Sequence, residues 1–348
     1  CFQGPASHCT YGDTRTVGLP PDKHAGIGAW TTLGVLSLWM SWQHFSQVCR
    51  NFTRQSSTVA NSMKPMQHRV ANLGLVFGLS FLVIVLQRAR LPLSLIPSPV
   101  GVYFLLSIAI TRVRAILGPA CHEIILTHPQ GFMVDVLGTR RIGPDNLTLL
   151  AFLYPFNRDS SSHPMPSQLE GFKIAERTGT NNRHIMWGIV LALVVSIIAS
   201  FWSFLHVMYV HGAEAKARGY ILGIGRENFG QLASWLQFPL HPNYYAVFFA
   251  GLGGLFTIFL MAMQRRLIWW PFHPGGYAMG ASWGMFHVWS AILVGWAIKV
   301  VILKHGGLRA YRKAVPFFIG VVLGDQVIGC PWSILGGLLG IQTYSVWY

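Results

Sequence analysis

The stretch Leu267–Leu303 reads LIWWPFHPGGYAMGASWGMFHVWSAILVGWAIKVVIL, an apolar run that prolines and glycines interrupt near its start. It is longer than the roughly 20 residues that a helix needs to cross a bilayer. Pro271 and Pro274 lack an amide hydrogen, so backbone polar groups lose their helical partners here. Such groups are tolerated at membrane depth only where protein or a wet cavity surrounds them. The stretch therefore predicts a broken or re-entrant membrane helix, with non-helical backbone from about Phe272 to Gly276, of a kind that often lines transport sites. A simple proline kink beside a loop is the alternative.

The composition extends the membrane interpretation to the whole chain. Of its 348 residues 52% are hydrophobic and 11% are charged, which excludes an ordinary soluble domain. The net charge of +15 comes from short Lys and Arg clusters between apolar runs, so we expect lipid headgroups rather than nucleic acid as the partner. The five cysteines show no CxxC spacing, and we expect no metal site, disulfide framework or cofactor.

The fold class that follows is all-α, a polytopic transmembrane bundle with a broken or re-entrant helix and amphipathic surface helices. We expect residues 1–24 to be the polar N-terminal segment of a fragment and 25–348 to be a single transmembrane domain. About seven spans are predicted: Ala25–Gln47, Val70–Gln87, Leu93–Ile110, Ile185–Val210, Tyr244–Gln264, Ser282–Leu303 and Val315–Tyr344.

Basic residues between these spans predict the topology, because cytoplasmic loops are enriched in Lys and Arg. The loops after the first, third and fifth spans should face the cytoplasm, which places Arg112, Arg140, Arg141 and Arg265 on one side. The cluster Lys304–Lys313 before the last span conflicts with this alternation, so the C-terminal topology stays open.

The longest polar stretch, 112–184, is expected to be a loop that carries one amphipathic surface helix, Gln168–Arg177. Its apolar positions, Leu169 and Phe172 among them, alternate with charge, so the helix should lie along the membrane surface. A second amphipathic piece, Ile224–Phe238, is predicted on the opposite side of the membrane.

Asp325 is the one acidic residue deep in an apolar span, and a charge there must be paired, protonated or facing water. It is a candidate for proton coupling or substrate binding, and we expect it to face the protein interior with a raised pKa. The alternative is a structural acid that holds the last span to a neighbour through Lys299 or Gln326. Lys299 lies near the end of its span, where snorkelling to the interface is the expected behaviour.

His273 and His287 are candidates for a proton relay, because imidazole titrates near neutral pH. Hydrogen bonding to freed backbone or simple packing is the competing role for each. The chain has no phosphate loop, nucleophile elbow or paired-carboxylate spacing, so we expect no enzyme activity. The candidate substrate or ion pathway comprises Pro271, His273, Pro274, Gly275, Gly276, Tyr277, His287, Lys299, Asp325 and Gln326.

Four motifs carry a resemblance to a known family. They are TRVRAILGPACHE from Thr111, HPMPSQLEGFKIAERTG from His163, LIWWPFHPGGYAMG from Leu267 and KHGGLRAYRKAVPFFIGVVLGD from Lys304. In order and spacing they resemble the C-terminal half of uncharacterised prokaryotic multi-spanning proteins related to the oligopeptide transporter superfamily. Ile116 departs from that pattern, where an acidic residue is expected.

The resemblance implies a transporter-like fold and a prokaryotic inner-membrane location. It also implies an N-terminal half of the same protein as a partner. Membrane lipid and an unidentified small solute are further expected partners. Whether copies of the chain associate stays open. Two functions remain from the sequence. The first is part of a secondary transporter for small peptides, metal chelates or another solute, in which Asp325 would sense protons if transport is proton-coupled. The second is a non-transporting membrane subunit or scaffold.

Overall fold

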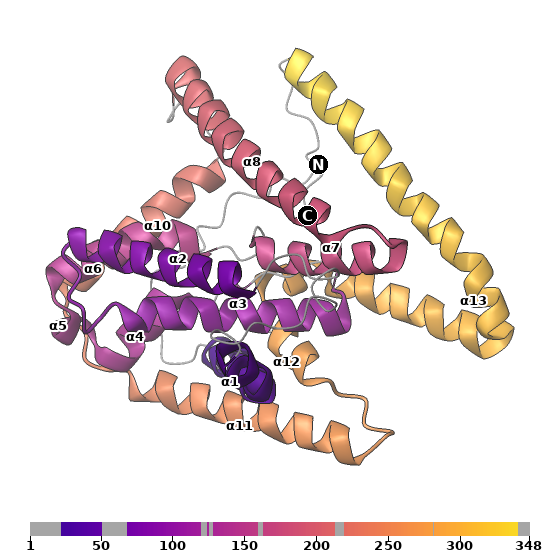
Figure 1. Cartoon of the computed structure of the whole chain (residues 1–348), viewed down its shortest axis with the longest axis horizontal. Helices are drawn as coiled ribbons and strands as arrows, with labels where there is room; N and C mark the ends of the chain where they lie inside the picture. The colour runs from indigo at the N-terminus through magenta and orange to yellow at the C-terminus, as the bar shows by residue number, and fades with distance from the viewer. Residues whose placement is uncertain are drawn as a thin grey trace. The chain divides into compact units, whose positions relative to one another are not determined.

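The computed structural model describes residues 22–50, 68–119, 124, 128–158, 163–212, 219–280 and 282–339. The predicted N-terminal segment 1–24 lies almost wholly outside these ranges. The chain divides into two compact units, Cys1–Trp283 and Gly284–Tyr348, and each is considered by itself. Throughout the described ranges the only regular secondary structure is helix (Figure 1).

The helices of the first unit are α1 (Asp22–Arg50), α2 (His68–Arg88), α3 (Pro97–Leu117), α4 (Pro129–Leu137), α5 (Thr139–Ile142), α6 (Pro144–Arg158), α7 (Pro164–Thr178), α8 (Asn182–His211), α10 (Gly219–Gln237), α11 (Tyr244–Arg266) and α12 (Pro274–Gly280). The helix α13 (Trp283–Leu339) lies in the second unit from Gly284 onward.

Five helical segments in the described ranges are long and apolar enough to cross a membrane: Val70–Arg88, Pro97–Leu117, Asn182–Val210, Tyr244–Arg266 and Val288–Gly336. The last of these overlaps both of the predicted C-terminal spans, Ser282–Leu303 and Val315–Tyr344. The protein is therefore a helical protein with the segments of an integral membrane protein, and Ala25–Gln47, predicted as the first span, is not among them.

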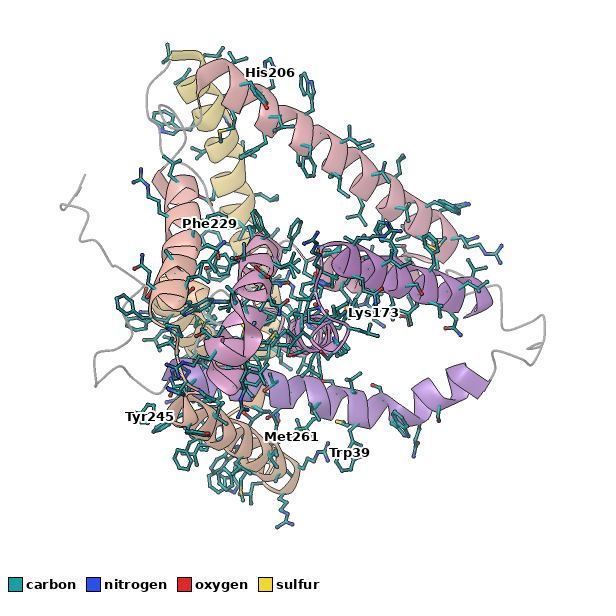
Figure 2. The ribbon with its side chains drawn as sticks, turned by 90° about the vertical axis from the view of Figure 1, so that its left-hand side faces the viewer. Trp39, Lys173, His206, Phe229, Tyr245 and Met261 are labelled. Carbon is teal, nitrogen blue, oxygen red and sulfur yellow. The ribbon has the colours of Figure 1, made fainter. Side chains whose placement is uncertain are left out.

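The packing of α1 explains why it differs from the other apolar helices. It contacts both α3 and α11, and Figure 1 shows it end-on where those two helices are seen from the side. Figure 2, turned by 90°, shows α1 from the side, with Trp39 labelled. Because α1 crosses α3 and α11 steeply, it is not parallel to these two candidate spans. Its buried residues, including Trp30, serve as the packing core of the unit.

Glycines allow α1 and α11 to approach closely where they cross. A Cβ on Gly28 would collide with the carbonyl group of Ala250, and one on Gly253 would collide with that of Ala25. Small residues at a crossing let two backbones approach, which is the usual means of helix association in membranes. The run GLGG at 251–254 is the corresponding signal in the sequence, but it does not identify which glycine meets another backbone.

The helices α3 and α11 run in the same direction. At their N-terminal ends, the buried cluster that contains Ile96 packs against residues of α6, and the Asn243 amide donates to the Asp135 carbonyl of α4 at 2.8 Å. At their C-terminal ends, Arg112 and Arg265 both reach Met40 of α1. Their parallel course agrees with the predicted topology, in which the third and fifth spans end on the same side.

The stretch 112–184 is not a loop with one helix, since it contains α4, α5, α6 and α7. The α4–α6 part lies at the N-terminal end of α11, where the Thr139 hydroxyl accepts from the Leu240 amide at 2.7 Å. Roughly 33 Å of helix separates that end from Arg265. If α11 spans the membrane, Arg140 and Arg141 therefore lie on the opposite side from Arg265. The prediction that they share a side with Arg112 and Arg265 is then wrong. It failed because charge counts along a loop carry no information on where the chain turns back.

The helix α10 packs on α6 in that same region. The Asn228 side-chain amide donates to the Ala151 carbonyl at 2.8 Å, and Leu232 joins a buried cluster with Met133, Val134 and other residues of α4–α6. The predicted amphipathic piece Ile224–Phe238 thus belongs to a helix that packs against the stretch 112–184. Its placement on the opposite side of the membrane from that whole stretch does not hold.

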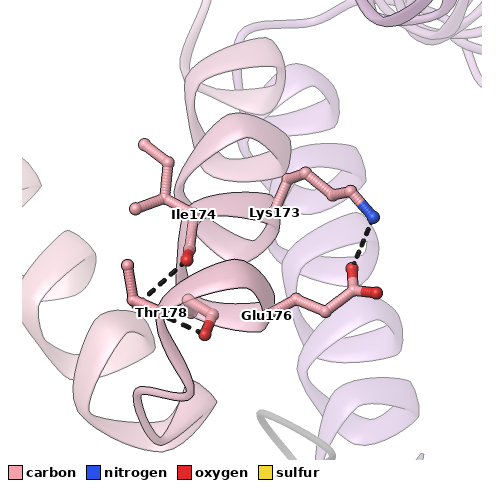
Figure 3. Close-up of polar contacts among 5 residues, drawn as sticks. Lys173, Ile174, Glu176 and Thr178 are labelled. Atoms are coloured by element: carbon pink, nitrogen blue, oxygen red, sulfur yellow. Dashed lines mark hydrogen bonds and ion pairs between the residues drawn. The ribbon is translucent and has the colours of Figure 1, made fainter.

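The predicted helix Gln168–Arg177 lies within α7, which runs alongside α3. Tyr103 meets His163 with ring centroids 5.8 Å apart, and Arg114 Nε pairs with Glu170 Oε1 at 2.6 Å, so the contacts advance along both helices together. If α3 crosses the membrane, α7 is inclined with it and does not lie flat on the surface. Lys173 donates to Glu176 at 2.8 Å on the exposed face (Figure 3), and this bond and charge lower the pKa of Glu176.

Candidate functional site

The helix break predicted from the proline and glycine run is present. The helix α11 ends at Arg266, residues 267–273 are non-helical, and α12 begins at Pro274. The non-helical backbone therefore lies several residues earlier than the predicted Phe272–Gly276, because Pro274 occupies the first helical position, where its missing amide hydrogen costs nothing. The short helix α12 packs against α1, α3 and α11, whereas the non-helical residues before it are largely exposed, Ile268, Trp269 and Phe272 among them. The enclosure expected for the break therefore applies to α12 and not to the break itself.

His273 caps α12. Its Nδ1 accepts from the Gly275 amide at 3.0 Å, and its carbonyl accepts from the amides of Gly276 and Tyr277. The imidazole therefore satisfies freed backbone groups, as the sequence suggested, although these groups are amides rather than carbonyls. Partial burial, and then the nearby charge of Arg112, lower the pKa of His273 below its ordinary value. Because Nδ1 accepts the bond from Gly275, the neutral form of the ring carries its hydrogen on Nε2.

Aromatic side chains flank the break. Trp270 meets Phe259 and Phe272 edge to face, and Tyr277 meets Phe256 with ring centroids 4.9 Å apart. Burial raises the pKa of the Tyr277 hydroxyl. Pro271 is exposed, whereas Pro274 and Gly275 are buried in the contacts of α12. The candidate residues from Pro271 to Tyr277 thus form one structured segment inside the first unit.

Two arginines that the sequence assigned only to topology lie beside this segment. Arg112 Nη2 lies 3.2 Å from the sulfur of Met40, and Arg265 Nη2 lies 3.5 Å from the same sulfur. Arg112 Nη1 also donates to Ser37 Oγ at 3.1 Å. Only the tertiary structure brings these side chains together, since they come from three helices. The positive charges that follow two predicted spans were the one signal available in the sequence.

The other candidate residues lie in the second unit, on α13. The ammonium group of Lys299 lies 5.7 Å from the ring centre of Tyr311, a cation–π distance, and not in an ion pair with Asp325. Asp325 is exposed on the surface of this unit, so the unit itself does not supply the buried setting that was expected. The side chains of His287 and Gln326 lie outside what the structure describes.

A hollow of about 1320 Å³ lies in the first unit between α3, α7 and the start of α8. The Arg114–Glu170 ion pair lines it together with Phe172, Lys173 and Asn181. Arg114 also donates to the Pro119 carbonyl. Its charged groups are largely paired with one another, so this hollow offers little unsatisfied charge to a ligand.

Gln130 of α4 is a polar residue that the sequence analysis missed. It is 2% exposed, and neither Nε2 nor Oε1 has a hydrogen-bond partner among the described residues. Buried amides are normally satisfied by protein or water. Across the same residues no group of three or more His, Cys, Asp and Glu side chains has metal-binding geometry.

Comparisons with known proteins give the family of the chain. Neither the curated proteins nor the solved structures include a match. A family model described as a family of unknown function (DUF6785) matches residues 6–348, which is nearly the entire sequence. The chain belongs to this family.

Proposed function

We propose that the chain is part of a secondary transporter that resembles the oligopeptide transporters and moves a small solute across the prokaryotic inner membrane. The observation that carries the proposal is the break in helix after α11, because the short helix α12 that follows it packs against α1, α3 and α11. Interrupted helices packed among other spans are common where transporters bind solutes. Small peptides and metal chelates are the first substrates to test, on the strength of the family resemblance.

Several further features belong to the proposal. The bundle has six spans when α13 is counted as two, and α1 would be the seventh. Asp325 is the proton-coupling residue, and its side chain is exposed within its own unit. The N-terminal half of the protein and membrane lipid complete the translocation pathway.

Uptake into proteoliposomes tests the proposal. The full-length protein should accumulate a labelled di- or tripeptide, or a metal chelate, above the level of protein-free vesicles. Uptake should increase with an inward proton gradient, and Asp325→Asn should remove that increase while leaving the protein folded. Failure of a broad peptide and chelate panel, with protein inserted in either orientation, would reject transport of these solutes.

A scaffold role is the competing proposal, and the surface of α8 favours it. The apolar window of this helix, Asn182–Val210, is 0% buried, so lipid or another protein must cover it. A scaffold would co-purify with a stoichiometric membrane partner, and the reconstituted protein would show no uptake. Co-purification followed by replacement of Trp187 and Phe201 on the exposed face separates a protein-covered helix from a lipid-covered one.

A further inference from the structure

We propose that Arg112 and Arg265 form a binding site for a phosphate or carboxylate anion beside the helix break. The two guanidinium groups come from α3 and α11 and converge on one atom, the sulfur of Met40, within 3.5 Å each. A thioether is a weak acceptor and carries no charge to offset two cations. Among the residues that the structure describes, neither arginine forms an ion pair with a carboxylate, so their mutual repulsion is unrelieved.

Ser37 fixes Arg112 in place. The Ser37 hydroxyl donates to the Leu33 carbonyl at 2.5 Å, so its oxygen is directed to accept from Arg112 Nη1. Ser37 is itself buried, and this anchors one edge of the guanidinium. A guanidinium has five donors in a rigid fork, and a phosphate or carboxylate matches two of them at once. Arg112 retains free donors after the contacts with Ser37 and Met40.

His273 lies near Arg112, whose charge acts on its ring. Its Nδ1 is occupied by the Gly275 amide, so the neutral ring presents Nε2–H. The nearby Arg114 differs from Arg112 in that Glu170 already neutralises it at 2.6 Å. The unpaired arginines therefore define the ligand as an anion. The source is either the phosphate of a lipid headgroup or a soluble anionic solute. Binding does not require transport, so the inference goes beyond the proposed function.

Inorganic phosphate is the first probe. We expect sodium phosphate to raise the unfolding temperature of the detergent-purified full chain above that in sodium chloride of equal ionic strength. Arg112→Gln and Arg265→Gln should each weaken the apparent affinity at least about 10-fold, because each loses a charge-assisted pair of hydrogen bonds. Arg112→Lys keeps the charge but loses the forked pair of donors. Its apparent affinity for phosphate should lie between those of the Gln variants and that of the native protein.

Arg266→Gln is the matched control. Arg266 is adjacent to Arg265 in the last turn of α11, is exposed and carries the same charge, yet it has no contact with Met40. Its phosphate response should be that of the native protein. An equal loss in Arg266→Gln would mean that general charge at the helix end, rather than a site, attracts the anion, and would overturn the proposal.

Nanodiscs distinguish the two sources. If a lipid phosphate occupies the site, nanodiscs with phosphatidylglycerol will abolish the phosphate response seen in pure phosphatidylcholine. Native mass spectrometry will then show phosphatidylglycerol bound to the native protein and lost from Arg112→Gln. If the response persists, a soluble anion reaches the site. No response to either probe, or equal responses in the native protein, Arg112→Gln and Arg265→Gln, would overturn the proposal. Arg265→Gln, which alters an exposed side chain, carries the test if Arg112→Gln fails to fold.

Discussion

At the scale of single residues, glycine determines how the first unit packs. Gly253 and Gly28 sit where the backbones of α1 and α11 meet, and a methyl group at either position would strike a carbonyl of the other helix. Gly251, two residues earlier on α11, has open space where a side chain would stand. The same residue type thus has different roles within one run, and the sequence does not distinguish them.

We expect Gly253→Ala to lower the unfolding temperature of the detergent-purified chain. Overpacking a close contact costs about 1–3 kcal/mol, which exceeds the gain in helix propensity of up to roughly 1 kcal/mol. Gly251→Ala is the matched control and should be neutral or slightly stabilising. Equal unfolding temperatures for the two variants would show that α1 and α11 do not approach as closely as described.

His273 makes the stability of the folded protein depend on pH. Its folded pKa lies below the ordinary value of 6.5, so below that pH the unfolded chain binds more protons than the folded chain. The stability that it contributes is present above pH 6.5 and is lost as the pH falls through the lowered pKa. We expect His273→Asn, which keeps a capping oxygen but does not titrate, to lose less stability between about pH 7 and 5 than the native protein. His273→Ala, which loses the cap as well, should be less stable than His273→Asn at both pH values. Parallel pH profiles for the native protein and His273→Asn would contradict this assignment.

At the scale of elements, α13 shows how a single residue divides a helix. Gly307 has φ 62° and ψ −169°, a conformation open essentially to glycine alone, and helix continues on both sides of it. The sequence indicated two spans separated by a polar linker from Lys304 to Lys313. The basic residues of that stretch lie instead within helix, because Lys and Arg have high helix propensity.

Replacing Gly307 should therefore straighten or destabilise α13. We expect Gly307→Ala to change the distance between spin labels attached at positions 295 and 318, measured by double electron–electron resonance. Gly320→Ala, on the same helix with ordinary φ and open space around it, is the control and should leave the distance unchanged. An unaltered distance in Gly307→Ala would show that another residue sets the bend.

At the scale of the whole molecule, the helices themselves were predictable from the sequence and their arrangement was not. Apolar runs and the proline and glycine cluster predicted most long helices and the break after α11, because these features act locally. The convergence of Arg112 and Arg265, the orphaned Gln130 and the packing of α10 on α6 depend on contacts between distant segments. A single sequence has no local signal for such contacts.

The return of α4–α6 to the start of α11 predicts a topology that labelling can measure. In a full-length chain whose native cysteines are replaced, we expect Arg141→Cys and Arg266→Cys to react with an impermeant maleimide from opposite sides of the membrane. Both native side chains are exposed, and the α11 helix separates them. With the C-terminal end of α11 cytoplasmic, the Arg141→Cys variant should be labelled in intact cells and the Arg266→Cys variant only after permeabilisation. Labelling of both variants from one side would show that α11 does not separate the two positions.

The contact between α6 and α10 also has a consequence for synthesis on the ribosome. Ala151 and its partner Asn228 are 77 residues apart, with the apolar helix α8 between them. At about 5–20 residues per second, the face of α6 that Leu232 covers waits roughly 4–15 seconds for its partner to emerge. During that interval α8 must already be inserted while α6 is still uncovered. The nascent chain thus needs a temporary cover for α6, from the insertion machinery or a chaperone, at the stage when α8 leaves the exit tunnel.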